Sequence, residues 1–286
     1  MVKKILITGA SGLIGGILIE HLSKNPNYDI YGIDKHIGLS IRYELEKNPS
    51  ILQKQQPILP SKDKFYICDM NDKNQLSQII QDNKINIIIH LAAVLETETV
   101  ENINSINCHG TKTLFDIATK QDHIEMIIYA SSTMAVFGYL ENEPYLSLTK
   151  NVQPKQMLKK ITVNDPPMPS HLNQSVEAYC NSKIYGEELA KKYASNDEIN
   201  IKFICARLGC INISDNPSRV YYWSDRSTWC SHRDLCQFVD RVLENQFKLK
   251  KFQIYFVSSN NDFAWTDFDN CRQDLNYAPQ DGAHWN

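Results

Sequence analysis

The fold is decided by residues 3–16, which read Lys-Lys-Ile-Leu-Ile-Thr-Gly-Ala-Ser-Gly-Leu-Ile-Gly-Gly. The apolar run at residues 5–7 predicts a buried strand, and a helical pattern of apolar residues follows directly after the glycines. Gly9, Gly12 and Gly15 fall where such a turn needs a positive φ, a close approach to a ligand and tight packing of helix on strand. The free N–H groups at the start of the helix would bind a pyrophosphate. A glycine-rich turn alone can also be purely structural.

The second predicted strand, residues 29–33, ends in an acidic residue. Asp34 follows Gly15 by 19 residues, the position from which a carboxylate accepts both hydroxyls of an adenosine ribose. The alternative is an ordinary turn residue at the end of a strand. Because a carboxylate repels a 2′-phosphate, Asp34 favours NAD over NADP, although Lys35 beside it could offset part of that repulsion.

Composition narrows the class of protein. The chain has 286 residues, of which 42% are hydrophobic, enough for one large core with a small additional region. A net charge of −3 without a basic block disfavours nucleic acid and membrane surfaces as partners. The eight cysteines include no Cys-x-x-Cys pair and no metal-ligand spacing, so we predict no metal and a cytoplasmic protein.

Strands alternate with helices along the chain. Further strands are predicted at residues 65–68, 85–91, 126–129, 199–206 and 252–257, and helices at 72–83, 100–120, 175–194, 232–245 and 265–275. This alternation predicts an α/β fold, a Rossmann-type doubly wound parallel sheet. Ligands bind such sheets at the carboxyl ends of the strands, so Gly9, Asp34, Asp69, Ala92 and Thr133 are expected to surround one crevice.

Two regions are expected. Residues 1–209 would form the dinucleotide-binding domain, and residues 210–286 a small substrate-binding region. Two proline-containing stretches, about 36–64 and 139–175, are long for connections and are predicted to be surface insertions. Ser175 or the residue beside it is expected to cap the helix that follows.

The strongest chemical motif is Tyr179-Cys-Asn-Ser-Lys183, which places a phenol and an ammonium one helical turn apart. A free phenol has a pKa of about 10, and a neighbouring positive charge helps it to accept a proton near neutral pH. Thr133, at a strand end, has a hydroxyl able to hold the same substrate oxygen. Tyr179 would take the proton of a substrate alcohol while hydride leaves the same carbon for a nicotinamide. Tyr-x-x-x-Lys alone is commonly a chance pair on an amphipathic helix.

Several motifs together resemble the extended short-chain dehydrogenase/reductase superfamily, in particular the NAD-dependent epimerase/dehydratase family. They are Thr8-Gly-Ala-Ser-Gly-Leu-Ile-Gly15, His90-Leu-Ala-Ala93, Asn107-Cys-His-Gly-Thr111, Ser131-Ser-Thr-Met-Ala-Val-Phe-Gly138 and Tyr179-Cys-Asn-Ser-Lys183. The resemblance implies NAD contacts by Gly9, Ser11, Gly12, Leu13, Ile14, Gly15, Asp34, Asp69, Met70, Leu91, Ala92, Ala93, Asn107, Tyr179 and Lys183. It also implies that Tyr179, Lys183 and Thr133 are catalytic, and that the chain forms a homodimer through the helices containing Asn107 and Tyr179.

The branch within the family is less defined. Sugar-nucleotide 4,6-dehydratases have Asp-Glu after the strand-end Thr, whereas this chain has Met134-Ala135. Epimerases usually carry a longer C-terminal region with a glycine-rich segment. The tail instead resembles uronate dehydrogenases, which implies a substrate site with Thr133 and Met134 and makes Arg219 a candidate for a substrate carboxylate. That group tends to have Ser-Asn-His where this chain has Thr-Met-Ala, which leaves a different sugar open.

The similar tail segments are Lys160-Ile-Thr-Val-Asn-Asp-Pro-Pro167, Trp229-Cys-Ser-His-Arg-Asp-Leu235, Ser258-Ser-Asn-Asn261 and Leu275-Asn-Tyr-Ala-Pro-Gln-Asp281. The leading hypothesis is therefore an NAD-dependent oxidoreductase acting on a small-molecule sugar or sugar acid. A nucleotide-sugar epimerase of the same family is the first alternative. The second is a non-catalytic NAD(P)-sensing protein, against which the presence of Tyr179, Lys183 and Thr133 argues.

Overall fold

The computed structural model describes residues 2–38 and 56–285 and contains a parallel sheet at its centre. Its strands are β1 (Lys3–Thr8), β2 (Tyr28–Asp34), β3 (Phe65–Ile67), β4 (Ile87–His90), β5 (Met126–Ser132), β6 (Lys202–Leu208) and β7 (Phe252–Val257). Their order in the sheet is β3-β2-β1-β4-β5-β6-β7, and each neighbouring pair is parallel. The predicted Rossmann-type doubly wound sheet is confirmed.

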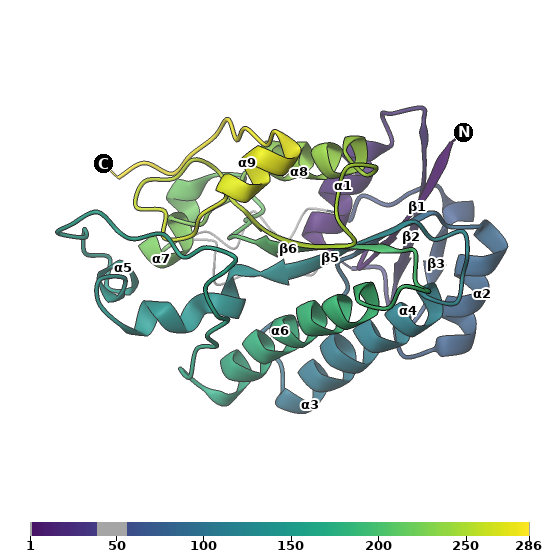
Figure 1. Cartoon of the computed structure of the whole chain (residues 1–286), viewed down its shortest axis with the longest axis horizontal. Coiled ribbons are helices and arrows are strands. Elements are labelled where there is room, and N and C mark those ends of the chain that lie inside the picture. The colour runs from purple at the N-terminus through teal and green to yellow at the C-terminus, as the bar shows by residue number, and fades with distance from the viewer. Residues whose placement is uncertain (1, 39–55, 286) are drawn as a thin grey trace.

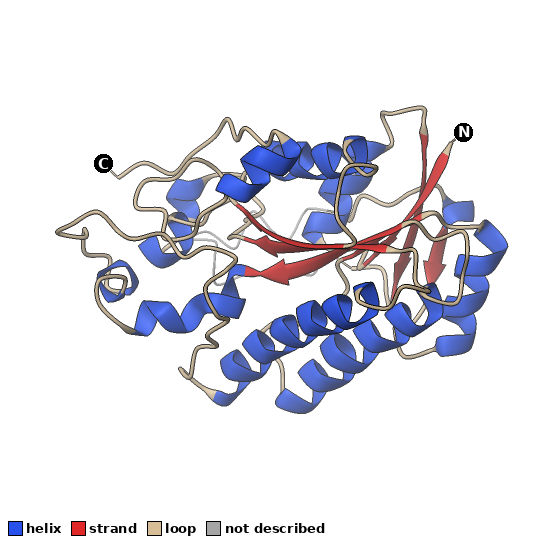
Figure 2. Cartoon of the chain, viewed as in Figure 1, coloured by secondary structure: helices blue, strands red, loops and turns tan. Residues whose placement is uncertain are grey.

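Helices cover both faces of the sheet (Figures 1 and 2). One face is covered by α1 (Leu13–Leu22), α8 (His232–Glu244) and α9 (Asp269–Leu275), and the other by α2 (Lys73–Asn83), α4 (Thr111–Ala118) and α6 (Gln174–Ala194). The helix ending in α4 starts as α3 (Val100–Ile103) and passes through a π-helical segment, η4 (Asn104–Gly110). Beyond the carboxyl ends of β5 and β6 lie α5 (Leu146–Thr149) and α7 (Trp223–Arg226), on the left in Figure 1.

The apolar strands supply both cores. Alternate side chains of β1 point to opposite faces, so Ile5 and Ile7 pack with the layer of α1 and α8 while Leu6 packs with the layer of α2 and α4. The strand β4 repeats this pattern, with Ile88 packed on the same face as Leu6. All four isoleucine and leucine side chains are at most 1% exposed. A strand covered on both faces reads as a continuous apolar run, which explains why the pattern was legible in the sequence.

The sheet order changes direction between β1 and β4. The strand β2 lies on one side of β1 and β4 lies on the other. The loops that follow β1 and β4 therefore lead away from each other and leave a crevice between them. Gly9 follows β1, and Leu91 follows β4 with its N–H 3.2 Å from the Thr8 carbonyl oxygen. The ligand site predicted for the carboxyl edge therefore has a physical opening.

Some boundaries differ from those expected. The helix α6 begins at Gln174, because the cap is Asn173, whose side chain accepts the Val176 N–H at 2.9 Å, rather than Ser175. The last helix begins at Asp269 and not near residue 265, since Trp265 is fully buried and its indole N–H is donated to the Ser224 carbonyl oxygen at 3.1 Å. Of the first expected insertion, residues 39–55 lie outside the described residues.

The region after residue 209 contributes to the central sheet as well as to its carboxyl edge. It supplies β7, which pairs with β6, and α8, which packs beside α1. In the ranges that the structure describes, no helix has the length and apolar character needed to cross a membrane.

Candidate active site

The glycine turn between β1 and α1 has the shape of a phosphate cradle. Gly9 has φ +69°, and a Cβ there would lie 2.9 Å from the Ala92 nitrogen. A Cβ on Gly15 would lie 2.5 Å from the Gly9 carbonyl oxygen, so only glycine allows helix and turn to approach this closely. The N-cap of α1 is Gly12, which has no side chain to occupy the first N–H groups of the helix. These groups and the helix dipole suit a pyrophosphate.

The end of β2 forms the ribose side of the crevice. The Asp34 carboxylate accepts the Ser11 backbone N–H at 3.0 Å, the Ser11 hydroxyl at 2.7 Å and the Lys35 backbone N–H at 2.8 Å. The Lys35 ammonium lies 3.0 Å from an Asp69 carboxylate oxygen. The Asn71 backbone N–H and the Lys35 ammonium hold the pKa of Asp69 below its usual range. Lys35 thus pairs with Asp69, and the role of Asp34 in excluding a 2′-phosphate stays a prediction.

A buried histidine joins the carboxyl ends of β1 and β4. His90 Nδ1 lies 2.7 Å from the Thr8 hydroxyl, and Nε2 lies 2.9 Å from the Thr111 hydroxyl. The Thr8 oxygen already accepts the N–H groups of Leu91 and Ala92, at 3.2 and 3.1 Å, so its own proton is donated to Nδ1. The Nε2–H is therefore donated to Thr111. Sequence reasoning quoted His90 only as part of a motif and did not predict this network.

Asn107 positions the crevice wall. Its side-chain oxygen accepts the Val94 N–H at 2.8 Å, and its side-chain nitrogen donates to the Val94 carbonyl oxygen at 2.9 Å and to the Ser182 hydroxyl at 3.2 Å. The Ser182 hydroxyl is in turn donated to the Tyr179 carbonyl oxygen at 2.7 Å. Asn107 thus ties the segment after β4 to the helix that carries Tyr179, and it is 1% exposed.

Tyr179 and Lys183 stand together on α6 facing the crevice. The Lys183 ammonium donates to the Ala130 carbonyl oxygen at 2.8 Å and lies 5.4 Å from the centre of the Tyr179 ring. It also lies 5.5 Å from the centre of the Tyr129 ring, so the charge is held between two aromatic faces. Burial lowers the pKa of Lys183 to about 8. The pair expected from the i, i+4 spacing is therefore present, with both side chains at most 7% exposed.

The structure brings most of the predicted cofactor residues to one crevice of about 500 Å³. It is lined by Gly9, Ser11, Gly12, Leu13, Ile14, Gly15, Asp34, Asp69, Met70, Leu91, Ala92, Ala93, Tyr179 and Lys183. Residues that the sequence did not single out for this role also line it, among them His36, Leu95, Ser132, Cys210 and Ile211. His36 follows Asp34 on the β2 side, and Cys210 and Ile211 follow β6, so chain order along the strand ends could have indicated them.

Three expected substrate residues lie outside that lining, as far as the described residues define it. Thr133 begins η5 (Thr133–Glu141) and is 4% exposed, whereas Ser132 lines the crevice and its hydroxyl accepts the Met134 N–H at 3.1 Å. Met134 lies in a buried apolar cluster with Tyr179. Arg219 is half-buried at the end of η6 (Pro217–Arg219). The substrate roles of Thr133, Met134 and Arg219 stay predictions.

A crevice lined by a glycine-rich turn and by a tyrosine and a lysine one helical turn apart is typical of short-chain dehydrogenases. The chain belongs to the NAD-dependent epimerase/dehydratase family, whose model matches residues 5–212. The predicted family, the Rossmann-type fold and dependence on NAD are confirmed at this level.

Relatives and solved structures match over nearly the whole chain. The NAD-dependent glucose-6-phosphate dehydrogenase of Haloferax volcanii is 23% identical over 284 residues, covering 99% of this chain and 95% of the relative. The L-arabinose 1-dehydrogenase (NAD(P)(+)) of the same organism is 21% identical, covering 98% and 97%. A uronate dehydrogenase variant from Agrobacterium tumefaciens, solved with NAD, is 22% identical, covers 99% of this chain and 86% of its own, and has a TM-score of 0.70. That structural likeness shows the fold.

Proposed function

We propose that the protein is an NAD-dependent dehydrogenase that oxidises a hydroxyl-bearing carbon of a sugar or sugar acid. The observation that carries the proposal is the Tyr179 and Lys183 pair on the wall of the glycine-turn crevice. The two dehydrogenases of Haloferax volcanii, which match almost end to end, are named for glucose-6-phosphate and L-arabinose. Both names describe oxidation of a sugar or sugar phosphate that carries no nucleotide, which favours a substrate without a nucleotide here.

NAD, when bound along the crevice, supplies the hydride acceptor. The Tyr179 oxygen takes the proton of the substrate hydroxyl, and Lys183 lowers the free-energy cost of the negative charge that Tyr179 carries in its basic form. The Ala130 carbonyl oxygen holds the Lys183 ammonium in place at 2.8 Å. A hydroxyl at the end of β5 holds the substrate oxygen while the proton leaves. It comes from Thr133, as the sequence indicates, or from Ser132, which lines the crevice.

We propose that the substrate lies against the region after residue 209. Cys210 and Ile211 of this region line the same crevice as Tyr179. Trp229, which is 3% exposed, donates its indole N–H to the side-chain oxygen of Asn212, the next residue, at 2.9 Å. Arg219 is the candidate partner for a substrate carboxylate, as its guanidinium can bind one in a bidentate manner. This assignment favours a uronic acid, and a neutral aldose would not need it.

The experiment that tests the function is a substrate panel with NAD. Free uronic acids, aldoses and nucleotide sugars are assayed for NADH and for isomerised product. A dehydrogenase accumulates one NADH for each substrate consumed, whereas an epimerase returns the hydride and accumulates isomer without NADH. Isomer from a nucleotide sugar would replace the proposal with the epimerase alternative. NAD binding without either product would favour a sensing protein.

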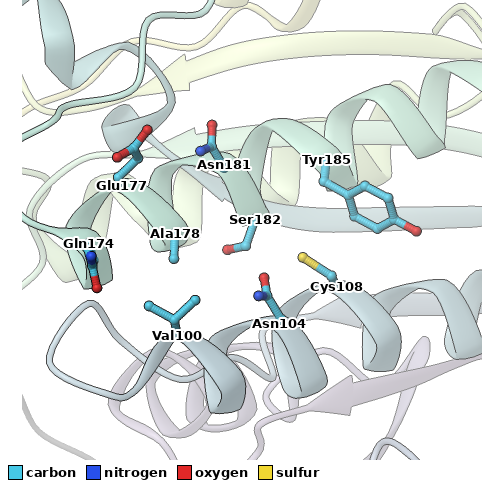
Figure 3. Close-up of a pocket in the computed structure, with 9 residues that line it drawn as sticks. All are labelled: Val100, Asn104, Cys108, Gln174, Glu177, Ala178, Asn181, Ser182 and Tyr185. Carbon is cyan, nitrogen blue, oxygen red and sulfur yellow. The ribbon is translucent and has the colours of Figure 1, made fainter.

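We also propose that the protein is a cytoplasmic homodimer. The free cysteines of the described residues are buried or half-buried, as suits a reducing compartment. The face between α6 and the helix of α3 and η4 is hollowed by a pocket of about 460 Å³, lined by Asn104, Cys108, Glu177, Asn181 and Tyr185 among others (Figure 3). Paired helices of a second copy would cover this face. Sedimentation velocity distinguishes a dimer from a monomer.

A further inference from the structure

A buried ion pair lies one helical turn beyond Lys183. The Glu187 carboxylate accepts Arg207 Nε at 2.9 Å on one oxygen and Arg207 Nη2 at 2.8 Å on the other. The Ser131 hydroxyl donates to the first of these oxygens at 2.5 Å. All three residues are at most 3% exposed. This arrangement fixes the carboxylate in position, because a guanidinium donates to both of its oxygens.

The ion pair and the Lys183 contact use the same two elements. Lys183 binds the carbonyl oxygen of Ala130, and Glu187, four residues later on α6, binds the hydroxyl of Ser131, the next residue of β5. Ser131 and Arg207 are partners in the register of β5 and β6. Consecutive turns of α6 are therefore fastened to consecutive residues of β5, just before the hydroxyls of Ser132 and Thr133. The cluster sets where the ammonium lies relative to the end of the strand.

The charges around Lys183 give Glu187 a second effect. From the packed elements, Lys183 is faced by Cys108 of η4, His90 of β4 and Tyr129 of β5, in addition to Tyr179 and Glu187 of its own helix. Arg207 of β6 is paired with Glu187. Burial raises the pKa of the Cys108 thiol and of the Tyr129 phenol, and burial lowers the pKa of His90 to about 3. Near neutral pH these groups are uncharged. Among the described groups that act on Lys183, the negative charge then comes from Glu187.

We propose that Glu187 is a positioning residue for the proposed reaction: held by Ser131 and Arg207, it keeps Lys183 protonated and in register with the end of β5. Lys183 is only 5% exposed, and without a nearby carboxylate its ammonium would lose its proton within the working pH range. A neutral Lys183 no longer lowers the cost of negative charge on Tyr179. The inference rests on the proposed function, since the role of the ammonium in turnover belongs to that proposal.

The test measures the protonation of Lys183 directly and needs no substrate. Protein labelled with ¹³C at lysine Cε is titrated by NMR, and the Lys183 signal is assigned by its loss in Lys183→Met. The variant Glu187→Gln keeps the side-chain shape and removes the charge. We expect the proton affinity of Lys183 to fall about tenfold in this variant. The matched control is Glu188→Gln, at an exposed position of the same helix, where the titration stays at the wild-type value.

Two further measurements keep the test decisive. Glu187→Gln leaves Arg207 buried without its carboxylate, so Glu187→Asp, which keeps the negative charge beside Arg207, is titrated as well and should leave Lys183 near its wild-type midpoint. In wild-type protein, Lys183 should titrate near pH 8. An unchanged Lys183 titration in a folded variant lacking the Glu187 charge would overturn the proposal, as would a wild-type midpoint far below neutral pH.

A turnover measurement then separates this inference from the proposed function. With an identified substrate, the alkaline limb of the pH profile of kcat should move to lower pH in Glu187→Gln and return in Glu187→Asp. A fall in kcat with an unmoved alkaline limb would show that Glu187 only supports the fold. If no substrate is turned over, the proposed function fails while the NMR titration still decides the relation between Glu187 and Lys183.

Discussion

His90 makes the stability of the fold depend on pH in a predictable direction. Burial, and to a lesser degree the charge of Lys183, lowers the pKa of His90 from 6.5 to about 3 in the folded protein. Between these values the unfolded chain binds a proton that the folded chain does not. The folded state is therefore at full stability above pH 6.5 and loses stability as the pH falls toward 3. At about pH 4.5 the contribution of this one residue is a loss of about 3 kcal/mol.

The variant His90→Gln isolates this contribution. Its amide can accept one hydrogen bond and donate another, which suits the Thr8 and Thr111 hydroxyls, but it does not titrate. The free energy of unfolding is measured by urea denaturation at about pH 7 and about pH 4.5 for both proteins. The variant starts less stable, because the amide fits the site less well. Between about pH 7 and about pH 4.5, the free energy of unfolding of the variant should fall by about 3 kcal/mol less than that of the wild type.

An equal loss in both proteins would refute the reasoning about His90. It would mean that His90 accepts a proton in the folded state without a large free-energy cost. The ¹H–¹⁵N spectrum of the imidazole provides an independent check, since the assigned form carries its proton on Nε2.

Two further predictions concern the cofactor site. Asp34→Ala removes the carboxylate at the end of β2, so the affinity for NAD should fall roughly tenfold and the preference for NAD over NADP should weaken. Isothermal titration calorimetry measures both affinities. An unchanged ratio of the NAD and NADP affinities would exclude Asp34 from selecting the cofactor. Gly15→Ala places a methyl group 2.5 Å from the Gly9 oxygen and 2.8 Å from the Ala10 oxygen, so the turn must shift. We expect this variant to lose about 1–3 kcal/mol of stability and most of its NAD affinity, and wild-type binding would show that the turn does not cradle the cofactor.

The parts of the structure that follow from local sequence were predictable. The glycine turn, Asp34 and the Tyr179 and Lys183 spacing are encoded by residues close together in the chain, and the apolar strands are read from their composition. These features gave the doubly wound sheet and most of the residues that line the crevice. The strand β2 (Tyr28–Asp34) is one residue longer at each end than the expected range of 29–33, because strand ends depend on pairing with neighbouring strands.

Contacts between distant residues were not predictable. Thr8 and His90 are 82 residues apart, and Ser131 and Glu187 are 56 apart, so no spacing rule connects them. The end of β5 illustrates the same point. Its pairing with β6 continues to Ser132, and Ser132 lines the crevice where the sequence had indicated Thr133. The α6 cap was misplaced because Asn and Ser are both good caps, and only the hydrogen bond distinguishes them.

Turnover by Tyr179→Phe tests the central claim most directly. The substitution keeps a ring that is 7% exposed in the wild type and removes the oxygen to which the proposed mechanism assigns the substrate proton. With an identified substrate, the account predicts that kcat falls by about 10²- to 10⁴-fold while affinity for NAD changes by less than about threefold. A variant that retains wild-type turnover would contradict the account.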